Sequence, residues 1–267
     1  MSDNFSTDFA GRNFILKTNY VAAQADGSAL VYYGDTVVLV TAVSLKSVRE
    51  GVDFLPLTVD YQEMTFAAGK IPGGFFKREG RPNEREILTS RIIDRAIRPL
   101  FPKGYYSETQ LVATVLSVDK ENDADVAAMI GASAALEISD IPFKGPIAGV
   151  RVGRIGGELV ANASPEKMQE SEMNLFLVGR KVTPSRSGRA YDVELVMMEG
   201  EAREVPEDII VDAIKFGLEA VRPVIDLQDR VRQAVGKAKR SVEEAAPDEE
   251  LIARVRPHDG QLQALGQ

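Results

Sequence analysis

The sequence predicts an α+β fold in which mixed β-sheets pack against α-helices. Strand-like segments come first, a helix, a strand and a second helix follow, and further short strands precede the closing helices. This order does not alternate strictly between strand and helix, as it would in a doubly wound sheet. With 267 residues, of which 44% are hydrophobic, the chain is long and apolar enough to bury a full core.

The first elements are predicted to be strands. Residues 28–33 and 36–44 are rich in β-branched and aromatic side chains, and the Gly34-Asp35 pair between them suits a tight hairpin turn. A further short strand is expected over residues 55–61. Residues 67–82 are rich in Gly and Pro and show no sustained period, so we expect a loop there.

Two helices are predicted after this loop. From Glu84 onward, apolar residues recur at intervals of three to five positions and form one face, until Pro99 and Pro102 end the pattern. The residues of this face are Leu88, Ile92, Ile93, Ala96, Ile97 and Leu100. Residues 111–118 predict a buried strand. Residues 123–138 predict a second helix, capped by Asn122 or Asp123, whose small residues 131–135 allow close packing against a sheet.

The second half of the chain predicts strands followed by helices. The strands are expected over residues 147–152, 158–161, 174–178 and 192–198, with Gly156-Gly157 at the first turn. Pro206 begins a long helix that runs to about Lys239 with one break at Pro223. We therefore expect one domain over residues 1–240, and a linker or the start of a truncated, all-α element over residues 241–267.

The composition excludes several classes of protein. There is no cysteine, and the one histidine, His258, lies in the polar tail, so thiolate metal sites and His-based triads are excluded. No segment matches a phosphate-binding P-loop, and Gly149, Gly153 and Gly156 do not fit the dinucleotide-binding pattern. No signal peptide and no apolar run of membrane-spanning length is present, so we expect a soluble, cytoplasmic protein without a membrane partner.

The charge distribution permits a nucleic-acid partner despite a net charge of −8. Residues 70–103 contain nine basic and four acidic residues, a local excess of five positive charges, whereas acidity is concentrated beyond Asp192. Screening limits each patch to about 8 Å at physiological salt, so a basic stripe on an acidic protein can still bind a polyanion.

The loop at residues 71–82 has the composition of a single-stranded nucleic-acid contact. Aromatic rings stack on bases and cations bind phosphates, and this loop offers Phe75, Phe76, Lys77, Arg78 and Arg81. The alternative is that both aromatic rings anchor a folded-back loop in the core and the cations are merely solvated.

Arg91, Arg95 and Arg98 follow on one helical face and extend the possible phosphate track. The alternative for Arg95 and Arg98 is pairing with Asp94, Glu86 or a neighbouring strand, which is common on helices of mixed charge. Acidic clusters at residues 119–125 and 170–172 offer oxygen ligands for Mg²⁺, but such clusters are more often solvated helix starts, so we assign no metal site here.

Several segments together resemble the polynucleotide phosphorylase family. They are DFLPLTVDYQE at 53–63, AAGKIPG at 67–73, FFKREGRP at 75–82, IDR at 93–95, RPLFP at 98–102, AMIGASAAL at 128–136 and IPF at 141–143. The resemblance extends from Phe14 to about Lys239, and residues 181–191 are less typical of it. It implies the first of two tandem ribonuclease PH-like domains, in a ring-shaped homotrimer with a central channel.

In that family the loop motif is Phe-Phe-Arg-Arg and contacts RNA at the channel constriction. Here it is Phe75-Phe76-Lys77-Arg78. Lysine keeps the positive charge but gives up the planar fork of arginine, so we expect a less directional contact at position 77.

The resemblance also implies that no catalytic residue lies in this segment. The family's active site is in its second domain, where a Ser-rich segment binds phosphate and an Asp-x-Asp-x-Lys set supplies metal carboxylates and a cation. The matching segments here are residues 121–125, which lack serine, and residues 172–176, where Asn174 and Phe176 replace a carboxylate and the lysine. Mg²⁺ and the co-substrate phosphate are therefore expected to bind outside this segment.

Three hypotheses follow for the function. In the first, the intact protein degrades mRNA with phosphate from its 3′ end and releases nucleoside diphosphates, alone or within an RNA-degradation complex, and this segment guides the RNA. In the second, the chain is a standalone, non-catalytic RNA-binding or ring-forming subunit. In the third and weakest, it is itself an active phosphorolytic enzyme that uses Glu170, Glu172 and the Arg91–Arg98 face.

Overall fold

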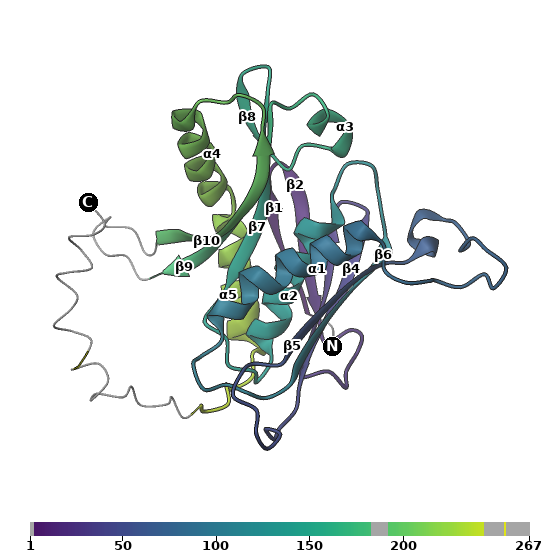
Figure 1. The fold of residues 1–267 in the computed structure, drawn as a ribbon, viewed down its shortest axis with the longest axis vertical. Coiled ribbons are helices and arrows are strands. Elements are labelled where there is room, and N and C mark those ends of the chain that lie inside the picture. The colour runs from purple at the N-terminus through teal and green to yellow at the C-terminus, as the bar shows by residue number, and fades with distance from the viewer. Residues whose placement is uncertain (1–2, 183–191, 243–253, 255–267) are drawn as a thin grey trace.

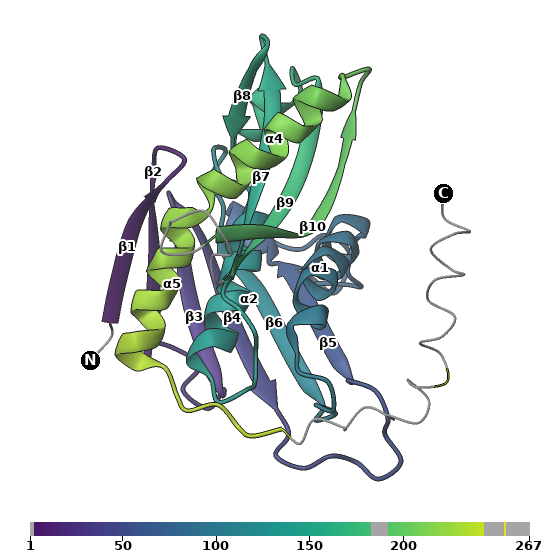
Figure 2. The same cartoon turned by 90° about the vertical axis from the view of Figure 1, so that its left-hand side faces the viewer.

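The computed structural model describes residues 3–182, 192–242 and 254, and these form two sheets with helices between and beside them (Figures 1 and 2). The α+β prediction is confirmed. The larger sheet has the order β1-β2-β3-β4-β6-β5, and its strands are β1 (Asp3–Phe9), β2 (Arg12–Thr18), β3 (Gly27–Tyr33), β4 (Thr36–Ser44), β5 (Leu57–Glu63) and β6 (Thr109–Ser117). The smaller sheet has the order β10-β9-β7-β8, and its strands are β7 (Ile147–Ile155), β8 (Glu158–Ala161), β9 (Met173–Val182) and β10 (Asp192–Ala202).

The predicted hairpin is confirmed as β3 and β4. Tyr33 pairs with Thr36, and Gly34 at the turn has a φ of +59°, a left-handed conformation that glycine adopts without strain. β4 pairs antiparallel with β6, and β5 joins β6 in parallel. Because parallel neighbours need a crossover connection, the chain passes through helix α1 (Glu84–Ile97) between β5 and β6.

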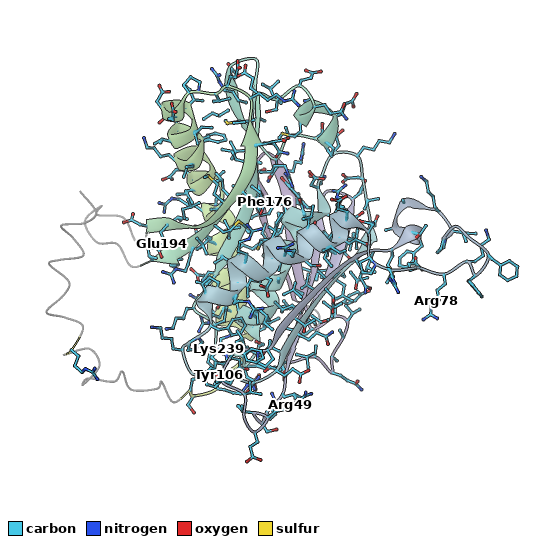
Figure 3. All side chains as sticks on the ribbon, viewed as in Figure 1. Arg49, Arg78, Tyr106, Phe176, Glu194 and Lys239 are labelled. Atoms are coloured by element: carbon cyan, nitrogen blue, oxygen red, sulfur yellow. The ribbon has the colours of Figure 1, made fainter. Side chains whose placement is uncertain are left out.

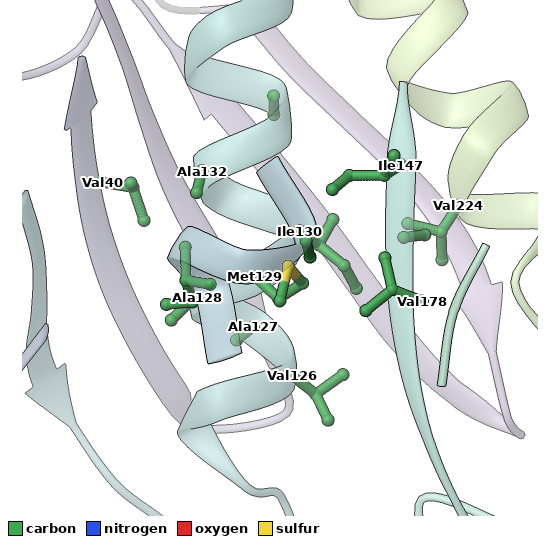
Figure 4. Close-up of a cluster of buried hydrophobic side chains, with 14 of the residues drawn as sticks. Val40, Val126, Ala127, Ala128, Met129, Ile130, Ala132, Ile147, Val178 and Val224 are labelled. Carbon is green, nitrogen blue, oxygen red and sulfur yellow. The ribbon is translucent and has the colours of Figure 1, made fainter. Parts of the chain in front are cut away.

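Helix α2 (Ala124–Ile138) lies between the two sheets and is buried over its whole length. Figure 4 shows its apolar side chains between Val40 of the larger sheet and Val178 of the smaller one. Gly131 allows the close approach, because a Cβ atom there would lie 2.5 Å from Cγ2 of Val40 and 2.8 Å from Cγ2 of Val31. The predicted packing of small residues against a sheet is therefore confirmed.

Helix α1 has the predicted start and end. Asn83 Oδ1 accepts a hydrogen bond from the Glu86 amide at 2.9 Å, and Glu86 Oε2 accepts one from the Asn83 amide at 2.7 Å, which forms a reciprocal capping box. Pro99 lies in the 3₁₀ turn η2 (Arg98–Leu100) that ends the helix. The apolar face was predicted too wide: Leu88 is 46% exposed, because it faces a pocket described below.

The predicted long C-terminal helix is two helices, α4 (Glu207–Ala220) and α5 (Arg222–Val235). The break lies at Val221, immediately before the first turn of α5, which contains Pro223. α4 covers the smaller sheet, and α5 packs on α2 and β1. The single turn α3 (Pro165–Met168) was not predicted, although Ser164 caps it and Pro165 begins it.

The N-terminal hairpin of β1 and β2 was not predicted. Phe9 pairs with Arg12 across a turn in which Ala10 and Gly11 have positive φ. The signal was the alternation in β2, where Phe14, Leu16 and Thr18 point inward. Polar residues in β1 obscured it, because β1 is an edge strand and one face of such a strand need not be apolar.

Residues 236–242 remain attached to the domain after α5 ends. The amides of Lys237 and Arg240 donate to the carbonyls of Ile138 and Asp140 at 3.0 and 2.8 Å. Lys239 Nζ donates to the carbonyls of Leu136, Glu137 and Ser139 at 2.6, 3.0 and 2.9 Å. Burial lowers its pKa to about 8. Figure 3 shows where Lys239 lies. The proposed domain boundary near residue 240 stays a prediction. Of the predicted linker, residues 243–253 and 255–267, with His258, lie outside the described residues.

Substitution of Gly27 by alanine is expected to destabilise the fold. A Cβ atom at Gly27 would lie 2.0 Å from the carbonyl oxygen of Ala135, and this backbone atom cannot move without displacing the last turn of α2. We expect Gly27→Ala to lower the free energy of unfolding by about 1–3 kcal/mol, the usual cost of overpacking. Denaturant unfolding measures this. Gly80→Ala is the control, since no atom lies within 4 Å of its Cβ position. Equal losses in both variants would contradict the prediction.

Candidate nucleic-acid interface

The loop over residues 69–82 extends away from both sheets. It follows β5 and the 3₁₀ turn η1 (Thr65–Ala68) and leads into α1. Figures 1 and 3 show it as the most prominent projection on its side of the molecule, with Arg78 on it. A hollow of about 530 Å³ lies between this loop and the start of α1, and Arg78 and Arg81 contribute to its lining.

The two aromatic side chains of this loop are exposed to solvent. Phe75 is 93% exposed and Phe76 is 86% exposed. Their rings contact each other edge to face, with centroids 5.5 Å apart. Neither ring anchors the loop in the core, so the inward-packing alternative is wrong, and both rings are largely exposed to a planar ligand.

The cations of the loop are also open. Lys77, Arg78 and Arg81 are exposed, and none forms an ion pair with a carboxylate of the described residues. Lys77 has a φ of +48°, a left-handed conformation that is uncommon for residues other than glycine. The loop therefore offers three positive charges beside two exposed rings.

The arginines of α1 differ from those of the loop. Arg98 pairs with both oxygens of Asp94, at 2.6 and 3.0 Å, and donates to the carbonyls of Leu55 and Leu57 at 3.1 Å each. Arg95 pairs with Glu199 of β10. For both Arg95 and Arg98, the structure therefore shows the alternative in which the arginine pairs with an acid. Arg91 is exposed, and within the described chain no ion pair involves it. All three line a pocket of about 690 Å³ with Val59, Ser90, Asp94 and Pro99.

A second pocket of about 690 Å³ lies on the other side of α1, where the start of α2 meets β9. It contains residues from both segments, 121–125 and 172–176, that the sequence resemblance compared with the family's catalytic segments. Asp123 and Asp125 come from the start of α2, and Glu172 and Asn174 come from the start of β9. The two segments are 45 or more residues apart in the chain, and the fold brings them together.

Arg151 of β7 occupies the floor of this pocket. It pairs with Asp125, its Nε lies 3.4 Å from Asp123 Oδ2, and it donates to Asn174 Oδ1 at 2.8 Å. Its guanidinium carbon lies 5.3 Å from the ring centroid of Phe176, within the range of a cation–π contact. Arg85 of α1 adds a second cation, 3.0 Å from Asp123 Oδ1. Burial raises the pKa of Asp123, as does the nearby Asp125 charge, and the two arginines oppose that rise.

These acids do not fit a metal site. Asp123 and Asp125 already bind guanidinium groups, which are fixed cations. Although burial opposes it, hydrogen bonds from the Asn122 side chain and from the amides of Glu121, Asn122 and Asp35 lower the pKa of Asp119. Glu172 pairs with Arg154 at 2.6 Å. Within the described residues, no group of three or more His, Cys, Asp or Glu side chains is placed to hold a metal ion.

Arg85 and Arg151 were missed by the sequence analysis. Arg151 lies within a strand of mostly apolar residues, and that isolation was the available signal. The Asp123 side chain does not cap α2, because its oxygens contact these two arginines instead.

Comparisons with known proteins agree with this architecture. Residues 10–142 match the 3′ exoribonuclease family, domain 1, and residues 145–220 match the 3′ exoribonuclease family, domain 2. The chain belongs to the 3′ exoribonuclease family. The two matched parts of this family member correspond to the larger sheet from β2 onward with α1 and α2, and to the smaller sheet with α4.

Relatives within the family are named polyribonucleotide nucleotidyltransferase, the systematic name of the polynucleotide phosphorylase that the sequence resembles. A polyribonucleotide nucleotidyltransferase of Syntrophus aciditrophicus is 69% identical over 255 residues, which cover 96% of this chain and 36% of that protein. One of Geobacter sulfurreducens is 51% identical over 251 residues, covering 94% and 34%. The chain thus spans about a third of the length of these relatives.

A solved structure of rice (Oryza sativa) Rrp46 supports the fold. It matches with a TM-score of 0.63 at 20% identity, over 82% of this chain and 94% of that one. The ribonuclease PH-like fold of this family member is therefore confirmed. In addition, none of the helices formed by the described residues has the length and apolar character needed to cross a membrane.

Removal of Arg151 is expected to destabilise the fold, because it leaves a buried acid without its ion-pair partner. Arg151→Met leaves Asp125, whose side chain is 7% exposed, without its ion-pair partner. We expect a loss of about 3 kcal/mol in the free energy of unfolding, the low end for breaking a buried pair. Arg49→Met is the control. Its pair with Glu108 is exposed, so its loss should stay below about 1 kcal/mol. Denaturant unfolding compares the two, and similar small losses would show that the pocket pairs contribute little.

Proposed function

We propose that this chain is the RNA-guiding part of a phosphate-dependent 3′-to-5′ exoribonuclease and is not itself catalytic. In this proposal the intact protein degrades mRNA and releases nucleoside diphosphates. The observation behind it is the exposed pair Phe75 and Phe76 beside the unpaired cations Lys77 and Arg78 on a projecting loop. Single-stranded RNA is bound by this combination of aromatic faces and positive charge.

The pocket at Arg151 supports the division of labour. Phosphoryl transfer depends on cations that neutralise phosphate oxygens and on metal ions held by carboxylates. Here Asp123 and Asp125 are neutralised by arginines, and position 176 holds a buried phenylalanine. A phosphate group entering this pocket would meet acids already committed to internal ion pairs, so chemistry is better placed elsewhere in the intact protein.

The remaining properties are extensions of this proposal. The relatives are polyribonucleotide nucleotidyltransferases by name, which supports RNA as the polymer. We propose inorganic phosphate as the co-substrate. We propose Mg²⁺ as the cofactor, bound outside this segment, and a homotrimer in the cytoplasm, in which Phe75, Phe76, Lys77, Arg78 and Arg81 contact the RNA strand and Arg91 extends the track. We also propose other proteins of an RNA-degradation complex as partners of the intact protein.

The first test is phosphorolysis by the 267-residue chain. Purified chain is incubated with end-labelled oligo(A), phosphate and Mg²⁺, and release of nucleoside diphosphate is followed over time. We expect no release, because Arg151 neutralises the acids of the pocket. Phosphate-dependent release that is lost in Glu172→Ala would instead identify the pocket as an active site.

The second test is the affinity of the loop for RNA. We expect Phe75→Ala and Phe76→Ala each to weaken oligo(A) binding by about 1–3 kcal/mol, the worth of one stacked base. Arg78→Ala should weaken binding and make it less sensitive to salt, since one phosphate contact is removed. Fluorescence anisotropy at several salt concentrations measures both effects.

The matched control for the aromatic variants is Phe54→Ala, because Phe54 is 62% exposed but lies on a different loop. The RNA-guiding role would be rejected if Phe75→Ala and Phe76→Ala bound oligo(A) as tightly as Phe54→Ala does.

A further inference from the structure

We infer that Glu79 is a positioning residue for the RNA-binding loop: its carboxylate ties the base of the loop to the start of η1 and so sets the direction in which the aromatic and basic side chains point. The inference rests on the function proposed above, since it concerns how the same loop is held. It assigns a role to the one acidic side chain within residues 70–82, a stretch that otherwise contains four basic residues.

The contact that carries the inference joins two points far apart along the loop. Glu79 Oε1 accepts a hydrogen bond from the Thr65 amide at 3.1 Å. Thr65 begins η1, and the preceding Met64 provides no side-chain cap. Because the first amides of a helix lack internal partners, the Glu79 carboxylate satisfies a group that would otherwise depend on water.

The turn η1 is itself attached to the sheet. The Val118 amide, just after β6, donates to the Ala67 carbonyl at 3.3 Å, and the Lys70 amide donates to the Thr65 carbonyl at 3.2 Å. The hydrogen bond between Glu79 and Thr65 therefore fixes the C-terminal side of the loop base to a turn that the larger sheet holds in place. Arg78 and Glu79 are adjacent, so this anchor lies next to the proposed RNA contact.

Beyond residues 69 and 70, the Glu79 contact is the restraint that the described residues place on this loop. Among the described residues, the Glu79 bond is the only hydrogen bond or ion pair that links residues 71–82 to another part of the chain. Gly69, Gly74 and Lys77 have positive φ, so the backbone between the two ends follows a specific, sparsely populated path. Freeing the base gives the segment more conformations, and RNA binding must then pay the entropy of ordering it.

The negative charge of Glu79 and its hydrogen bond to Thr65 predict opposite effects on RNA binding, so an experiment can separate the two. The Thr65 amide holds the pKa of Glu79 below its ordinary value, so the group is ionised at neutral pH. A negative charge beside Lys77, Arg78 and Arg81 repels phosphate. If charge alone mattered, any neutral residue at position 79 would strengthen RNA binding.

The experiment compares Glu79→Ala with Glu79→Gln in the 267-residue chain. Both variants remove the charge, but glutamine keeps an oxygen that can accept from the Thr65 amide. We expect Glu79→Ala to bind oligo(A) roughly two- to tenfold more weakly than Glu79→Gln, the effect of losing one hydrogen bond. Glu79→Gln should bind at least as tightly as the unchanged chain.

A second measurement reports the loop without RNA. Trypsin cleaves after lysine and arginine unless proline follows, so the loop offers it Lys77 and Arg78, whereas Arg81 precedes Pro82. We expect faster cleavage within the loop in Glu79→Ala and an unchanged rate in Glu79→Gln. Glu50→Ala is the charge-matched control, because Glu50 is an exposed acid outside this loop, and it should change neither readout.

The outcomes separate this inference from the function on which it rests. If Glu79→Ala and Glu79→Gln bind oligo(A) equally well while Arg78→Ala binds more weakly, the loop binds RNA but Glu79 does not position it, and the inference is overturned. If Arg78→Ala also binds like the unchanged chain, the proposed RNA contact fails, and the positioning role fails with it. In that case, faster cleavage of Glu79→Ala would show that the hydrogen bond between Glu79 and Thr65 orders the loop but does not affect RNA binding.

Discussion

Complete burial of α2 is the constraint on which the rest of the structure depends. The helix contacts β3 and β4 on one side, β7 on another and α5 on a third, so each of these elements covers part of its surface. A helix that is apolar all round is stable only inside such an enclosure. The two sheets cannot separate, or shift along the helix by even one side chain, without opening a cavity around Met129 and Ile130, both fully buried.

The charged residues of α2 lie at its two ends, and both ends require cations. Asp125 at the first turn pairs with Arg151. Glu137 at the last turn is 1% exposed; burial raises its pKa, and its pair with Arg232 at 2.7 Å opposes that rise. Lys239 then binds the last carbonyls of the helix, where the negative end of the helix dipole lies. The pocket at the start of α2 is thus an ion-pair network that the enclosure of the helix makes necessary.

The sequence predicted the elements whose signals are local and missed those that depend on distant partners. The hairpin at Gly34, the start of α1 at Glu84 and the small-residue packing of α2 follow from turn chemistry, periodicity and composition within a few positions. The Asn83 cap of α1 was not predicted. The hairpin of β1 and β2 was missed because its polar residues give no period of their own. The exposure of Phe75 and Phe76 could not be decided either, since composition does not reveal whether a loop folds back. Arg151 was missed because its partners come from α2 and β9, and only the fold brings these segments together.

The same limit applies to the basic stripe inferred from counting charges. Of the cations between residues 70 and 103, Arg85, Arg95 and Arg98 pair with acids that lie outside or within that stretch, so their charge is largely neutralised locally. Lys77, Arg78 and Arg81 of the loop, with Arg91 of α1, have no such partner among the described residues. Counterion release scales with the phosphates that a protein neutralises, and paired arginines contribute little to it. The net local charge therefore measures RNA attraction poorly. The relevant feature is that the cations left unpaired among the described residues are concentrated on a loop that the sheets do not cover. Elsewhere, the packing around α2 brings the cations into ion pairs.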